Sequence, residues 1–108
     1  MPAFATSVLY PAEVSKTFKM DYYLSTHMPL VMKNLKQFGL ESYTIVKLAP
    51  GPDGAEPPYS VLATLNWADV EGVAKAGASE AMKEIIDDIP NFSEKPAIFL
   101  GGPVVGTS

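Results

Sequence analysis

Alternating apolar and polar positions along the chain predict four β-strands. The clearest alternation runs from Tyr59 to Trp67, where every second residue is apolar and most of the intervening positions are polar. Three other stretches are rich in β-branched and aromatic residues, and the last of them contains glycines and a proline that favour the edge of a sheet. These stretches are Phe4–Tyr10, Leu40–Leu48 and Pro96–Val105.

A helical period lies between the first two predicted strands. From Met20 to Gly39 apolar residues recur at steps of three and four, which places them on one face of a single helix. Gly39 suits the left-handed position that ends a helix. Pro29 lacks an amide hydrogen, so it either begins a new helical segment or kinks the existing one. The predicted buried face comprises Met20, Leu24, His27, Val31, Leu35 and Phe38.

A second helix is predicted after the third strand. Asp69 is a suitable N-cap, while Gly77 and Ser79 favour a break after which Ser79 caps a second helical piece. The order strand, helix, strand, strand, helix, strand predicts an α+β, ferredoxin-like βαββαβ fold. In that fold a four-stranded antiparallel sheet carries both helices on one face. We expect residues 1–108 to form a single domain.

Both faces of the predicted strands are apolar. In the first strand Phe4 and Val8 face one way, whereas Ala5 and Leu9 face the other. Because two helices cover only one face of a sheet, the second face would be a large exposed apolar patch, which soluble monomers avoid. The pattern therefore predicts a two-fold homodimer with its sheets packed face to face.

The composition narrows the classes of function. The chain has no cysteine, which excludes disulfides and thiolate chemistry, and its eight basic residues are all lysines. The net charge of −4 argues against nucleic acid as a partner. With one histidine, and with Asp87 and Asp88 diverging as neighbours on a helix, we expect no metal site. The chain shows neither a secretion signal nor an apolar run of about 20 residues, so we expect a cytoplasmic protein that does not bind membranes.

His27, the only histidine, interrupts the apolar face of the first helix. Its ordinary pKa of about 6.5 allows acid or base catalysis near neutral pH, although a histidine that packs in the core and bonds the backbone is the alternative. Tyr23 lies one turn earlier and either orients a ligand oxygen or packs with its hydroxyl toward water. Asp21 is six residues before His27, so we expect it to stabilise the helix N-terminus.

Three sequence blocks resemble the EthD family of small dimeric α+β barrel proteins. They are K-M-D-Y-Y-L-S-T-H-M-P-L-V from Lys19, P-Y-S-V-L-A-T-L-N-W from Pro58 and D-I-P-N-F-S from Asp88. The resemblance implies a ferredoxin-like protomer, a homodimer and a cleft between the helices and the sheet. Similar proteins include fungal polyketide-pathway decarboxylases and a muconolactone methylisomerase, and the wider superfamily adds cofactor-free monooxygenases and haem-handling enzymes. One departure is Tyr43, which stands where similar sequences often have tryptophan.

The resemblance implies a small hydrophobic pocket in which His27 performs acid–base chemistry on an oxygenated aromatic, polyketide-like or lactone molecule. The reaction would be that of a cofactor-independent, monooxygenase-like oxidoreductase, a decarboxylase or an isomerase, and no cofactor or metal is expected. His27 and Tyr23 are the candidate catalytic residues. The candidate substrate-binding residues are Asp21, Tyr22, Tyr43, Trp67, Asn91 and Phe92.

Three other interpretations remain open at the level of sequence. The first is a non-catalytic carrier of a small molecule, or an accessory protein to an oxygenase system. The second is haem binding through His27. The third is a dimeric module without a ligand, in which the motif serves only helix packing.

Overall fold

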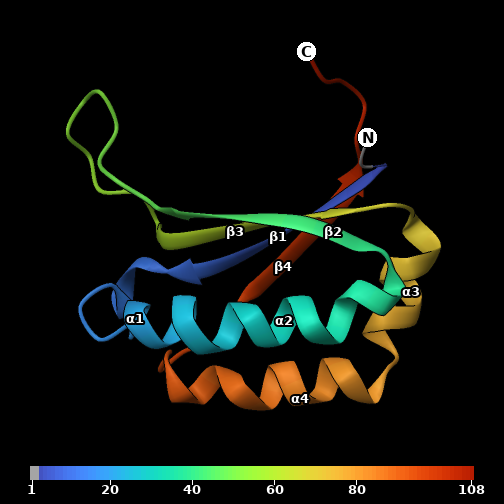
Figure 1. Cartoon of the computed structure of the whole chain (residues 1–108). Helices are drawn as coiled ribbons and strands as arrows, with labels where there is room; N and C mark the ends of the chain where they lie inside the picture. Colours follow the sequence, from blue (N-terminus) through green and yellow to red (C-terminus); the bar gives the residue numbers. More distant parts are fainter. Residues whose placement is uncertain (1–2) are drawn as a thin grey trace.

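The computed structural model describes residues 3–108 and contains one four-stranded antiparallel sheet with the helices on one face (Figure 1). The strand order is β2-β3-β1-β4, so β2 and β4 form the two edges. This arrangement confirms the predicted α+β, ferredoxin-like fold. The strands are β1 (Phe4–Pro11), β2 (Leu40–Lys47), β3 (Tyr59–Trp67) and β4 (Ile98–Pro103).

The helical stretch between β1 and β2 is a chain of short segments and not one uniform helix. A single 3-10 turn, η1 (Ala12–Val14), precedes it, and Gly39 ends it with a φ of 98°. Pro29 lies in the first turn of its α-helical part, where its missing amide costs least. The segments are α1 (Met20–Tyr22), the π-helical turn η2 (Tyr23–His27), α2 (Met28–Leu35) and the 3-10 turn η3 (Lys36–Phe38).

The π turn changes which side chains the first helical stretch buries. The amide of Met28 bonds the carbonyl of Tyr23, five residues back, so this turn holds one residue more than an α-helical turn. Tyr23, four residues before His27, is buried at 1% exposure, whereas the wider turn leaves Leu24 47% exposed. The prediction that Leu24 lies on the buried face was wrong, because it assumed an unbroken period of 3.6 residues.

The second helical stretch divides where the sequence predicts a break. The Asp69 carboxylate accepts a hydrogen bond from the Gly72 amide at 2.8 Å, and the Ser79 hydroxyl accepts one from the Met82 amide at 3.1 Å. Both N-cap predictions are thus confirmed. The segments are α3 (Val70–Gly77), α4 (Glu80–Asp88) and the 3-10 turn η4 (Ile89–Asn91).

The helices α2 and α4 lie side by side beneath the sheet (Figure 1). Asn34 on α2 joins them, since its amide donates to the Ala81 carbonyl at 3.3 Å and to Glu84 at 3.1 Å. None of the helices within residues 3–108 combines the length and the apolar character that a membrane crossing requires.

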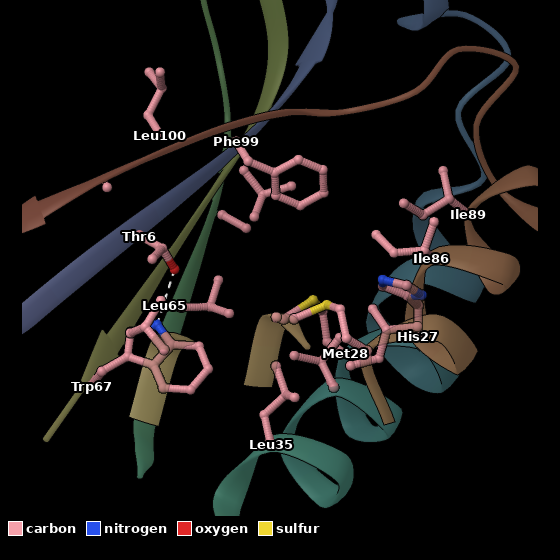
Figure 2. Close-up of a pocket in the computed structure, with 18 of the residues that line it drawn as sticks. Thr6, His27, Met28, Leu35, Leu65, Trp67, Ile86, Ile89, Phe99 and Leu100 are labelled. Carbon is pink, nitrogen blue, oxygen red and sulfur yellow. Dashed lines mark hydrogen bonds between the residues drawn. The ribbon is translucent and has the colours of Figure 1, made fainter. Parts of the chain in front are cut away.

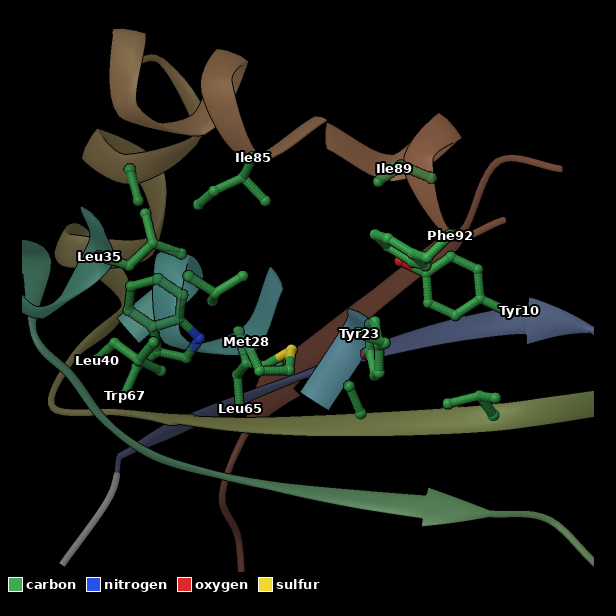
Figure 3. Close-up of a cluster of buried hydrophobic side chains, with 14 of the residues drawn as sticks. Tyr10, Tyr23, Met28, Leu35, Leu40, Leu65, Trp67, Ile85, Ile89 and Phe92 are labelled. Atoms are coloured by element: carbon green, nitrogen blue, oxygen red, sulfur yellow. The ribbon is translucent and has the colours of Figure 1, made fainter. Parts of the chain in front are cut away.

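The inner face of the sheet carries the core. The alternation predicted for β3 is confirmed, because Val61, Ala63, Leu65 and Trp67 are all buried against the helices (Figure 3). No helix within residues 3–108 lies over the outer face. Strand register aligns one apolar residue from each strand there, in the row Ile98, Leu9, Leu62 and Val46. We call these four residues the outer row.

Gly72 provides a test of how α3 packs on the 3-10 turn η3, which contains Phe38. A Cβ at this position would overlap the carbonyl oxygen of Phe38, whereas a Cβ at Gly77 in the same helix meets no atom within 4 Å. We expect Gly72→Ala to lower the free energy of unfolding by about 1–3 kcal/mol. Gly77→Ala should leave it unchanged or raise it by up to about 1 kcal/mol. Urea denaturation of both variants measures the difference, and equal effects would contradict this packing.

Candidate active site

A cavity of about 430 Å³ lies between the inner face of the sheet and the helices (Figure 2). Its walls come from β1, β3 and β4 on one side and from the helical segments on the other, and nearly all of them are apolar. Phe99 and Ile86 line it and are also 56% and 40% exposed, so the mouth lies between β4 and α4. The polar lining residues are Thr6, Tyr10, Tyr23 and His27, together with the indole of Trp67.

His27 lies in the cavity wall at the end of the π turn, beside Tyr23. The His27 side chain stacks on the ring of Tyr23, with centroids 5.5 Å apart and an interplanar angle of 15°. Phe92 contacts both rings, with its centroid 4.4 Å from that of His27 and 4.9 Å from that of Tyr23. His27 is only 3% exposed, so its imidazole is largely withdrawn from bulk water.

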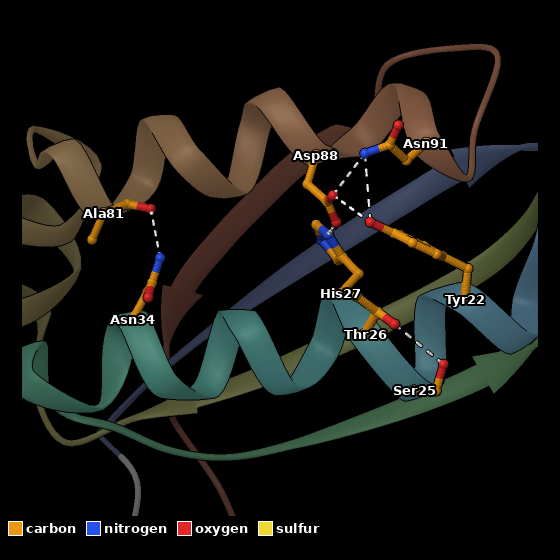
Figure 4. A network of polar contacts seen from close by, with 8 residues as sticks. All are labelled: Tyr22, Ser25, Thr26, His27, Asn34, Ala81, Asp88 and Asn91. Atoms are coloured by element: carbon orange, nitrogen blue, oxygen red, sulfur yellow. Dashed lines mark hydrogen bonds and ion pairs between the residues drawn. The ribbon is translucent and has the colours of Figure 1, made fainter.

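Asp88, at the end of α4, holds one nitrogen of the imidazole. The distance between His27 Nδ1 and Asp88 Oδ2 is 2.9 Å (Figure 4). The other oxygen of this carboxylate, Oδ1, accepts hydrogen bonds from the Tyr22 hydroxyl at 2.6 Å and the Asn91 amide at 2.9 Å. A histidine oriented by a fixed carboxylate is the arrangement found when one ring nitrogen must be free to exchange protons.

Burial and hydrogen bonding together set the ionisation of this pair. Burial lowers the pKa of His27, and the hydrogen bond and charge of Asp88 oppose this without cancelling it, so the pKa stays below its ordinary value. For Asp88 burial raises the pKa, but hydrogen bonds from Tyr22, Asn91 and His27 outweigh it and hold the pKa below its ordinary value. A neutral imidazole therefore faces a carboxylate at neutral pH.

The carboxylate also decides which tautomer of His27 is present. An ionised Asp88 can only accept hydrogen bonds, so the proton of the neutral imidazole is assigned to Nδ1. Nε2 then carries a lone pair. It makes no hydrogen bond to any residue from 3 to 108, and its ring borders the cavity. This nitrogen is placed to take a proton from a bound molecule.

Two tyrosine hydroxyls accompany the imidazole. Tyr10 and Tyr23 line the cavity, and their rings lie 5.8 Å apart, edge to face. Neither hydroxyl bonds another residue within the described part of the chain. Burial is the main reason why the pKa of each phenol is raised, so both stay protonated as possible hydrogen-bond donors.

The residues predicted from sequence fall into three groups. His27, Tyr23 and Trp67 line the cavity. Tyr22 and Asn91 lie behind the imidazole, where both bond Asp88, and Phe92 packs against the imidazole.

Asp21 and Tyr43 lie apart from the others. The carbonyl of Asp21 accepts a hydrogen bond from the Ser25 hydroxyl at 2.6 Å on the exposed side of the first helical stretch. Tyr43 is half-buried on β2, where it packs against the core, and it is not among the residues that line the cavity.

Sequence reasoning missed Asp88, Tyr10 and Thr6. It considered Asp88 only as half of a metal-binding pair with Asp87. The pairing with His27 was missed because 61 residues separate the two in the sequence. The block D-I-P-N-F-S, which begins at Asp88, was the one signal that could have drawn attention to it. Tyr10 and Thr6 share a face of the first strand with Phe4 and Val8, and the sequence gave no further signal for them.

Comparison with known proteins identifies the family of the chain. The EthD domain family model matches residues 12–96, which is most of the chain. The chain belongs to the EthD domain family. No curated protein matches the sequence of this EthD-domain protein.

Solved structures similar to this EthD-domain protein cover nearly its whole length. An EthD-like protein from Ralstonia eutropha JMP134 is 26% identical, with a TM-score of 0.78, over 100% of this chain and 96% of that chain. A dimeric ferredoxin-like protein from an uncultured marine organism is 16% identical, with a TM-score of 0.58, over 100% and 92%. A cofactor-independent oxygenase from Streptomyces nogalater is 10% identical, with a TM-score of 0.56, over 97% and 94%. The last two similarities concern the fold alone.

The single histidine makes its ionisation directly measurable. We expect the pKa of His27, followed through its ring proton signals by NMR, to lie below about 6.5. Asp88→Asn should lower it further, because the carboxylate's hydrogen bond and charge now raise it. Asp87→Asn, the same change at the exposed neighbouring position, should leave it unaltered. An unchanged or higher pKa in Asp88→Asn would show that the carboxylate does not act on the imidazole.

Proposed function

We propose that this EthD-domain protein binds a small oxygenated aromatic, polyketide-like or lactone molecule in the cavity, where His27 transfers a proton. One observation carries the proposal. On an otherwise apolar wall, Nε2 of His27 is without a protein partner among residues 3–108 while Asp88 holds Nδ1 at 2.9 Å. A buried base that borders a largely apolar cavity is an arrangement that packing alone does not require.

The proposed chemistry begins with Nε2 removing a proton from a phenol or from a carbon beside a carbonyl. The positive charge that forms on His27 is stabilised by the Asp88 carboxylate, and the negative charge that forms on the ligand oxygen is stabilised by donors such as the hydroxyls of Tyr10 and Tyr23. Isomerisation and cofactor-independent oxygenation can start from such an anion, and decarboxylation generates one. The fold shared with a cofactor-independent oxygenase is consistent with this group of reactions.

A non-catalytic carrier is the second candidate function. It is favoured by the lining of the cavity, which is apolar over nearly all of its surface. Burial of an apolar ligand needs no titrating group and would be almost independent of pH. Base catalysis, in contrast, requires the unprotonated form of His27.

We also propose that the protein is a homodimer joined through the outer face of its sheets. Within one chain the outer row leaves Ile98 and Val46 about two-fifths exposed, at 41% and 40%, on a face with no helix over it. Contact between two such faces would remove this apolar surface from water, which stabilises the association. The similar fold of a dimeric ferredoxin-like protein agrees with this assembly.

Nitrobenzisoxazole offers a direct test of the proposed base. Removal of its ring C–H proton by Nε2 breaks the N–O bond and releases a coloured cyano-nitrophenolate, so the reaction needs a base and no further reactant. We expect the protein to accelerate this elimination and His27→Gln to reduce the rate by roughly a hundredfold. The rate should rise with pH through an inflection below about 6.5, because the pKa of His27 is lowered.

Two carboxylate variants serve as controls for the same measurement. Asp88→Asn should move the inflection to lower pH, whereas Asp87→Asn should not move it. Full activity of His27→Gln would contradict the base assignment. If His27→Gln were fully active in this way and calorimetry showed that it still bound para-phenylphenol, the carrier function would replace the catalytic one.

A charge placed in the outer row should separate the proposed dimer. Leu62→Lys would bring a charge from each chain into the proposed apolar interface, and we expect the dimer dissociation constant to rise at least about tenfold. Leu24→Lys is the matched control, because this leucine is 47% exposed on the helical side of the chain. Analytical ultracentrifugation measures both. A dimer equally stable in Leu62→Lys would contradict association through this face.

A further inference from the structure

Thr6 lies across the cavity from His27, and its hydroxyl proton makes no hydrogen bond to the described part of the chain. Trp67 Nε1 donates a hydrogen bond to Thr6 Oγ1 at 3.0 Å (Figure 2). An indole N–H is a donor only, so the Thr6 oxygen is the acceptor in this bond. The hydroxyl proton of Thr6 finds no acceptor among residues 3–108, and Thr6 lines the cavity.

The backbone of the neighbouring strand packs closely on the methyl group of Thr6. Gly101 of β4 is the register partner of Thr6, and a Cβ on it would lie 3.2 Å from Thr6 Cγ2 and 3.1 Å from the ring of Phe4. The missing side chain at Gly101 therefore makes room for the Thr6 methyl group and the Phe4 ring. Thr6 itself borders the cavity, from which a bound molecule can approach its hydroxyl.

The two polar ends of the cavity are well separated. Tyr10 is four residues after Thr6 in the same strand, so at the usual rise per residue their backbones are about 13 Å apart. Tyr10 contacts Tyr23, whose ring stacks on His27, so it marks the imidazole end. The wall between the ends is apolar and includes Val8 and Leu65.

We propose that the Thr6 hydroxyl is a second binding subsite, and that the cavity takes a rigid, elongated two-ring molecule with an oxygen at each end. One oxygen lies at the His27 end, and the other accepts the hydrogen bond that Thr6 has free. This proposal rests on the proposed function, because the His27 end must hold the first oxygen. A cavity of about 430 Å³ lies within the range of pockets that enclose molecules of this size.

Three phenols test the subsite by calorimetry. Para-phenylphenol has one hydroxyl, para,para′-biphenol has one on each ring, and phenylcatechol has both on one ring. We expect biphenol to bind about tenfold more tightly than phenylphenol. This ratio is the product of a factor of about five from one hydrogen bond and a factor of about two from the two equivalent orientations of biphenol. In Thr6→Val this preference should fall to about twofold or less.

Further variants separate the hydrogen bond from its surroundings. Thr6→Ser keeps the hydroxyl and should retain the preference for biphenol. Because Thr6→Val leaves the buried Trp67 N–H without its acceptor, the double variant Thr6→Val/Trp67→Phe repeats the test without that unpaired donor. The affinity for phenylcatechol relative to phenylphenol should be the same with and without the Thr6 hydroxyl.

The outcomes distinguish this proposal from the function on which it rests. If phenylphenol binds and His27 performs the elimination, but biphenol binds no more tightly or keeps its preference in Thr6→Val, the subsite is wrong and the proposed function stands. Thr6 then serves only to pair the indole of Trp67. If neither phenol binds in the cavity, the subsite and the proposed function both fail.

Discussion

The site depends on one backbone hydrogen bond, from the Met28 amide to the Tyr23 carbonyl. This π turn adds a residue to the helix and rotates everything before it relative to α2. In a regular α-helix Tyr23 and Leu24, four and three residues before His27, would both lie on its face. The extra residue widens the turn, so that Tyr23 stays beside the imidazole while Leu24 turns outward and is 47% exposed. The local irregularity thus selects the phenol, and not the leucine, as the neighbour of the imidazole.

The electrostatics of the site follow from a competition between burial and charge. Removal of the imidazole from water favours its neutral form, and the nearby carboxylate favours the charged form. Burial is the larger effect for His27, while three hydrogen bonds keep Asp88 ionised. The two groups therefore avoid a buried ion pair in the resting state, whose desolvation would be costly. Charge separation appears only after Nε2 has accepted a proton, when Asp88 is already in place to stabilise it.

Much of the fold could be predicted from sequence because the signals are local. Alternation identified β3, and the caps at Asp69 and Ser79 marked both helical segments, since each signal involves residues within a few positions of one another. The site was less predictable. The π turn breaks the period on which helix prediction depends, and the pairing of His27 with Asp88 depends on how α4 lies beside the first helical stretch. The free hydroxyl proton of Thr6 likewise becomes visible only when Trp67 is seen to use the oxygen.

Composition gives this cavity an unusual experimental property. The chain contains a single histidine and a single tryptophan, and they border opposite sides of the same cavity. Each end therefore has its own spectroscopic reporter, the imidazole ring protons at one and the indole fluorescence at the other, with no second residue of either type to confuse the signal. A short ligand held at one end should perturb one reporter, and a molecule that spans the cavity should perturb both. Ligand length and orientation could thus be read in solution from the natural sequence without added labels.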